Sequence, residues 1–143
     1  MQHALTIRVV ALVVVILATG AAATSYLGSS NKAQAGAAHA HVAAAAQAVD
    51  AWYQDPFGGH GSYRALDTAQ LLKEAPAVSP DVHVTLLAHG RAYCLDDEEG
   101  SNSAYYIGGD FHAIRNLNGA QPLTVVPVHS AATSAAAVCA NAS

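Results

Sequence analysis

The chain has 143 residues, of which 52% are hydrophobic and 11% are charged, and its formal net charge is −4. Alanine, which buries little surface, supplies much of the hydrophobic share, so the larger apolar side chains suffice for one small core. This composition excludes a multidomain enzyme and a polytopic membrane protein. The six lysines and arginines stand singly along the chain, so we expect no nucleic-acid partner.

Residues 1–28 form an apolar segment that predicts export, because Arg8 precedes a long run of aliphatic and small residues. As an anchor, residues 9–28 would span about 30 Å as a helix, enough to cross a bilayer. As a signal peptide, the segment would be cleaved after the small residues 21–23. We expect the following side chains to lie in lipid or in a bundle of helices: Val9, Leu12, Val15 and Ile16.

Residues 29–54 contain no proline and are rich in alanine, which predicts a helix. Core-suited residues recur there at steps of four and three, a spacing that gathers them on one face. We expect this face to pack on a sheet through Val42, Val49, Trp52 and Tyr53. The apolar segment and this helix would then form one continuous helix. The alternative is a cleaved leader followed by a separate helix.

The remaining residues predict a short helix and a small sheet. Asp55-Pro56 ends the long helix, and Asp67 is suited to cap a helix over residues 68–75 within a loop region 55–80. Alternating patterns then predict strands over residues 82–87, 91–96, 104–108 and 123–128, the last an edge strand bounded by prolines. A coil tail follows from residue 130. The predicted fold is therefore α+β, with a long N-terminal helix on a three- or four-stranded antiparallel sheet, in one exported domain spanning residues 29–143.

Cys94 and Cys139 are the two cysteines, and neither has neighbours with the spacing of a zinc site. Because the chain carries an export-type segment, one disulfide is the favoured interpretation, and two unpaired buried thiols are the alternative. The disulfide would hold the tail against the second strand.

This organisation resembles type IV pilins and pseudopilins. The helix end at residues 52–55 (Trp-Tyr-Gln-Asp), with residues 61–64 (Gly-Ser-Tyr-Arg), resembles the end of a pilin spine helix and its Gly-x-Tyr-Pro loop, with arginine in place of proline. Residues 91–95 (Arg-Ala-Tyr-Cys-Leu), followed by Tyr105 and Tyr106, are similar to the sheet of pilins that have a Tyr-Cys-Leu strand. In that family a cysteine pair often fastens the last segment to the sheet, and Cys94 and Cys139 match it.

The N-terminus departs from the family pattern. Prepilins have Gly, then Phe or Met, then Thr-Leu-Ile-Glu, whereas the nearest run here is Ala-Leu-Thr-Ile at residues 4–7, with Val9 in place of the glutamate. The resemblance therefore does not imply processing by a prepilin peptidase.

We predict no cofactor, metal site or catalytic site. His39 and His41 point to different sides of a helix and cannot share a metal, and these two and the other histidines are expected at the surface. Residues 96–99 (Asp-Asp-Glu-Glu) lack the alternating spacing of a calcium loop and are expected in a solvated hairpin loop. His60 and Ser62 lack the strand–turn–helix context of a hydrolase nucleophile.

The function we expect is that of a non-enzymatic, pilin-like subunit of a cell-surface filament or a secretion-type pseudopilus. It would be a single-pass membrane protein with its C-terminal domain outside the cytoplasm, or part of the filament itself. Its partners would be membrane lipid and copies of itself or related subunits. The alternative is a secreted or periplasmic binding module with a cleaved signal peptide. A weaker third hypothesis is a small exported hydrolase that uses Ser62 or a histidine.

Overall fold

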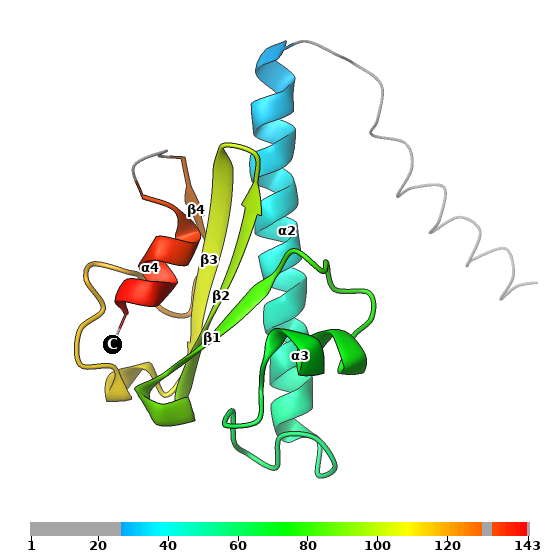
Figure 1. The fold of residues 1–143 in the computed structure, drawn as a ribbon, viewed down its shortest axis with the longest axis vertical. Coiled ribbons are helices and arrows are strands. Elements are labelled where there is room, and N and C mark those ends of the chain that lie inside the picture. The colour runs from blue at the N-terminus through cyan, green and yellow to red at the C-terminus, as the bar shows by residue number, and fades with distance from the viewer. Residues whose placement is uncertain (1–26, 130–132, 143) are drawn as a thin grey trace, which may run out of the picture.

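A computed structural model describes residues 27–129 and 133–142. Over these residues the chain is α+β, as predicted, with one long helix and a four-stranded antiparallel sheet. Helix α2 (Leu27–Gln54) lies on one face of the sheet, and the short helix α4 (Ala135–Asn141) lies on the other (Figure 1). The first turns of α2 rise beyond the end of the sheet in this view.

Helix α2 follows from a proline-free, alanine-rich sequence, and its end follows from Pro56. A residue before proline is disfavoured in helical conformation, and Asp55 instead accepts a hydrogen bond from the Phe57 amide at 2.8 Å. The loop then folds back so that Gly59 N donates to Trp52 O at 2.9 Å. A Cβ at Gly59 would come within 2.9 Å of the indole ring, so this turn requires glycine.

Helix α3 (Thr68–Glu74) is the predicted short helix, one residue shorter than expected. Asp67 caps it, because its carboxylate accepts a hydrogen bond from Gln70 N at 2.7 Å. Thr68 Oγ1 accepts from Val84 N at 3.0 Å, which ties the start of the helix to the sheet. The buried Leu71 then reaches the core between α2 and the sheet.

The sheet is a meander in the order β1-β2-β3-β4, with strands β1 (His83–Leu87), β2 (Ala92–Glu99), β3 (Asn102–Gly109) and β4 (Val126–Val128). Short 3-10 turns, η1 (Ala88–Gly90) and η2 (Phe111–Ala113), follow β1 and β3. In the central hairpin Leu95 faces Tyr106, and Glu99 faces Asn102. Pro127 lies in the edge strand β4, where the loss of one amide donor is tolerated.

Three predictions of local structure are wrong. The central strands run on through the predicted acidic loop, and only Gly100 and Ser101 form the turn. β4 begins at Val126 and not at Leu123, because Leu123 has a left-handed backbone (φ 59°) that leaves the strand conformation. The tail forms helix α4, which begins where Ser134 Oγ accepts a hydrogen bond from Ala137 N.

Two cores lie on the two faces of the sheet, because successive strand residues point to opposite sides. On the α2 side, the buried face of the helix packs against α3 and the alternate strand residues Tyr93, Leu95 and Ala104. On the α4 side, Ala135 and Cys139 pack against the other set, which contains the following residues: Leu87, Ala92, Cys94, Tyr105 and Ile107.

Candidate functional site

The predicted packing face of α2 lies on the sheet. Val42 and Val49 are fully buried, and Trp52 is 5% exposed. Tyr53 is half-buried and turns toward the following loop, where its ring stacks on Tyr63 at a centroid distance of 4.5 Å. This face therefore fixes the helix to the domain.

A row of tyrosines continues from this loop along the sheet. The Tyr63 ring lies 4.8 Å from that of Tyr93, which lies 6.1 Å from that of Tyr106. Burial raises the pKa of Tyr63 to about 12, with contributions from Tyr53 and Asp50. Burial also raises the pKa of Tyr93, whose hydroxyl donates to Asp50 Oδ1 at 3.5 Å. The row packs as neutral phenols.

Cys94 and Cys139 form a disulfide across 45 residues of sequence. Cys94 lies in β2 and Cys139 in α4, so the bond holds the C-terminal helix on the sheet. Both residues are buried. This arrangement matches the expected link between the tail and the second strand.

The predicted membrane and assembly residues Val9, Leu12, Val15 and Ile16 lie outside the described residues. None of the helices within residues 27–129 and 133–142 combines the length and the apolar character needed to cross a membrane.

A cluster that sequence analysis missed joins α2 to the central hairpin. His41 Nδ1 lies 2.9 Å from Asp97 Oδ2 and 3.5 Å from Glu99 Oε1. Asp97 and Glu99 are two residues apart in β2, so both point toward the helix. Asp97 is fully buried, and its Oδ1 has no hydrogen-bond partner among the described residues. We call His41, Asp97 and Glu99 the helix–hairpin cluster.

The prediction that residues 96–99 are solvated is wrong for the two aspartates, because both lie in β2 and are buried. Asp96 faces the opposite side from Asp97, next to the exposed His83 at 3.8 Å. Burial raises the pKa of Asp96 to about 6, although His83 acts in the opposite direction. His41 is likewise half-buried and paired, whereas a free surface histidine was expected.

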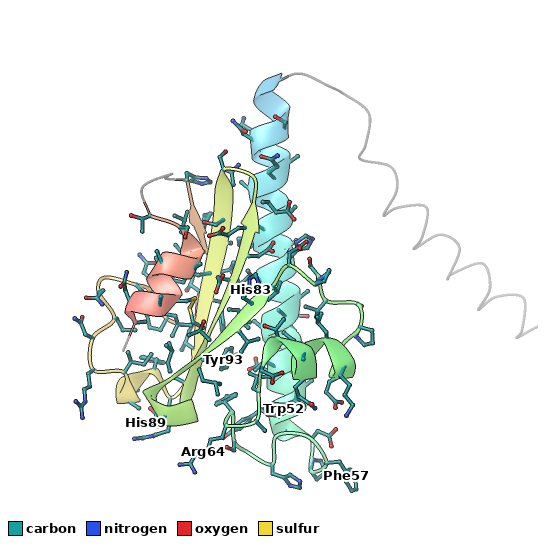
Figure 2. The ribbon with its side chains drawn as sticks, in the orientation of Figure 1. Trp52, Phe57, Arg64, His83, His89 and Tyr93 are labelled. Carbon is teal, nitrogen blue, oxygen red and sulfur yellow. A yellow bond between two sulfur atoms is a disulfide. The ribbon has the colours of Figure 1, made fainter. Side chains whose placement is uncertain are left out.

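A basic hollow lies at the end of the sheet opposite the central turn. Its volume is about 820 Å³, and its lining includes Arg64, His89, Arg91 and Arg115. Figure 2 shows Arg64 and His89 at this end, with Phe57 directed away from the body of the molecule. His89 has a left-handed backbone (φ 59°), and Arg91 Nη2 lies 2.5 Å from Asp110 Oδ2. The hollow thus presents guanidinium groups suited to an anion.

The two residues of the hydrolase hypothesis, His60 and Ser62, do not form a site together. Ser62 Oγ accepts a hydrogen bond from Arg64 N at 3.3 Å, and His60 is exposed in a left-handed turn conformation (φ 49°). Within the described residues, no hydrogen bond joins the two side chains. This geometry gives no particular support to the third hypothesis.

Two sequence signals were available for the features that we missed. Asp97 and Glu99 share one strand face once β2 extends to Glu99, which brings their carboxylates together. Ser134 before a run of alanines is an N-cap signal for α4. The partner of Asp97, in contrast, lies 56 residues earlier in the chain.

Comparison with known proteins identifies no relative: no protein-family model, no curated protein and no solved structure matches this chain significantly.

Proposed function

We propose that this chain is a non-enzymatic, exported, pilin-like subunit of a cell-surface filament or a secretion-type pseudopilus, held in the membrane or the filament by its N-terminal hydrophobic helix. The observation that carries the proposal is the asymmetry of α2. One face is buried on the sheet through Val42, Val49 and Trp52, while the other face is open to solvent. The first turns of α2 rise beyond the sheet, so they add little to the core of their own domain (Figure 1). They are placed to contact another molecule.

The open face of α2 supports packing against other helices. Its exposed alanines recur at steps of seven and four residues, a spacing that places them in one stripe. Small side chains allow helix backbones to approach closely. The stripe consists of Ala33, Ala40, Ala44 and Ala51. Copies of α2 packed along this stripe would extend the apolar contact that residues 9–17 begin.

The mature N-terminus tests the proposal. We expect mass spectrometry of the protein from fractionated cells to find residues 9–17 retained, and the protein to sediment with membranes or with filaments sheared from the surface. A soluble monomer that begins at Thr24 would overturn the proposal. That result would favour the binding module instead.

Cross-linking tests the surface through which copies would meet. With a cysteine introduced on the open face, Ala44→Cys, oxidation of intact cells should give disulfide-linked multimers. The control is Ala69→Cys, which is also exposed but lies on α3, away from the stripe. Multimers from both variants, or from neither, would contradict packing through α2.

The basic hollow favours the second candidate, a secreted binding module. Three of the chain's six basic residues, Arg64, Arg91 and Arg115, line this one concavity. Its volume falls within the range of about 300–1,000 Å³ that small-molecule sites occupy. Its ligand would be a small anion such as a carboxylate or a phosphate ester. The filament proposal remains the better supported of the two, because the hollow is open and Arg91 already pairs with Asp110.

A further inference from the structure

The helix–hairpin cluster combines ligand types that a transition metal prefers. A ring nitrogen of His41 and carboxylate oxygens of Asp97 and Glu99 all lie within 4.8 Å of one another. One imidazole with two carboxylates is a donor set suited to Zn²⁺ and related divalent ions. The three residues come from two elements, α2 and β2, whose relative position is fixed by the core around Val42 and Leu95. The backbones that carry the donors are therefore held in place by packing.

The spacing of the donors is close to that of tetrahedral coordination. Ligand atoms about 2.0–2.2 Å from a zinc ion lie about 3.3–3.6 Å from each other. The distances from His41 Nδ1 to Asp97 Oδ2 and Glu99 Oε1 are 2.9 and 3.5 Å. The Glu99 distance falls in this range, and the Asp97 distance would have to lengthen by about 0.4 Å for both oxygens to bind one ion.

The state of Asp97 supplies an independent indication. Its side chain is fully buried, and its Oδ1 has no hydrogen-bond partner among the described residues. A buried carboxylate oxygen that lacks a hydrogen-bond donor is costly, because the protein interior solvates its charge poorly. Glu99 adds a second carboxylate beside the same imidazole, so at most one positive charge faces two negative ones. A divalent cation would balance this charge and contact the buried carboxylate.

Access from solvent is preserved at this cluster. The side chains of His41 and Glu99 are 34% and 30% exposed, while Asp97 forms the buried floor. An ion can therefore enter from the surface and keep a water molecule as its fourth ligand. Three protein ligands with one open position is the arrangement of an accessible zinc site.

We propose that His41, Asp97 and Glu99 bind one Zn²⁺ or similar transition-metal ion, which links the long helix to the central hairpin. The ion would bridge elements 56 residues apart in sequence and stabilise their contact. The proposal does not depend on filament assembly.

Titration of the full-length chain with zinc tests the site. We purify the protein in detergent, remove metals with a chelator, and add Zn²⁺, or Co²⁺ as a spectroscopic probe. One ion should bind per chain, the midpoint of thermal unfolding should rise, and Co²⁺ should give the intense visible absorption of tetrahedral coordination. Absence of stoichiometric binding, or binding of Ca²⁺ without Zn²⁺, would overturn the proposal.

Variants locate the ion, which matters because the chain has eight histidines. His41→Ala and Glu99→Gln should each weaken Zn²⁺ binding by at least about tenfold and abolish the Co²⁺ spectrum. The matched control is His39→Ala, an exposed histidine two residues away on the same helix, which should bind as the unaltered protein does. Equal losses in His39→Ala and His41→Ala would assign the binding to scattered surface histidines and refute the site. Glu99 is partly exposed, so Glu99→Gln tests the site even where replacement of a buried residue disturbs folding.

Discussion

At the scale of single residues, the structure places polar groups in the interior with partners from distant segments. The tyrosine row and the helix–hairpin cluster both lie between α2 and the sheet, and each joins side chains of different elements. Residue type alone indicates that such side chains prefer the surface or an interface. They are buried because they contact residues that are distant in the sequence and that only the folded chain brings close.

The buried tyrosines predict a loss of stability in alkali. Burial raises the pKa of Tyr63 from 10.0 to about 12, so the unfolded chain gives up its proton at lower pH than the folded one does. The free energy of unfolding should therefore fall as the pH rises from about 10 to about 12, and Tyr63 should account for on the order of 1–2 kcal/mol. Tyr63→Phe should reduce this fall, measured by urea denaturation at successive pH values.

The control for the alkaline series is a return to neutral pH before each measurement. Full recovery shows that the loss reflects titration and not damage to the disulfide. A Tyr63→Phe variant that loses stability as steeply as the unaltered protein would show that its hydroxyl is not responsible.

At the scale of elements, α2 and α3 were easier to predict than the strand ends or the C-terminal helix α4. The spacing of four and three in residues 38–52 and the Asp67 cap are local signals, and the structure contains both helices. The central hairpin was predicted too short, because Asp97 is a residue type that favours loops. It remains in β2 because cross-strand pairing holds it and His41 contacts its side chain. That contact depends on how α2 lies on the hairpin, and a local sequence pattern does not predict this arrangement.

Gly36 is a replaceable weak position in helix α2. A Cβ there would meet nothing within 4 Å, and glycine inside a helix costs about 0.5–1 kcal/mol relative to alanine. Gly36→Ala should therefore raise the helical content and increase the free energy of unfolding by about that amount, as measured by circular dichroism and urea denaturation.

The comparison for Gly36→Ala is Gly108→Ala on β3. A Cβ at Gly108 would lie 2.5 Å from the Tyr93 ring, so this variant should lose at least about 1 kcal/mol. Destabilisation by both substitutions would show that the first turns of α2 make a contact that requires glycine.

At the scale of the whole molecule, the sheet separates two cores that differ in the size of the apolar side chains their helices bury. The α2 side contains Trp52, Leu66, Leu71, Tyr93 and Leu95. On the α4 side the C-terminal segment contributes mainly small residues, among them Ala135 and Ala142, which bury little apolar surface. The C-terminal helix has only seven residues, too few to be stable on its own. Its position on the sheet must come from contacts beyond its own hydrophobic area.

The disulfide supplies that restraint, so its removal should release α4 first. In the chain-entropy model, a link across 45 residues contributes on the order of 4 kcal/mol. Replacement of both cysteines by alanine should lower the free energy of unfolding by about 2–4 kcal/mol, measured by urea denaturation. Amide exchange should increase in α4 more than in α2, while the fluorescence of Trp52 on the other face stays native before global unfolding.

Ala140→Ser, an exposed change in α4, is the control and should alter stability by less than about 0.5 kcal/mol. If exchange instead increases equally on both faces, the two cores form one cooperative unit and the disulfide stabilises the molecule as a whole.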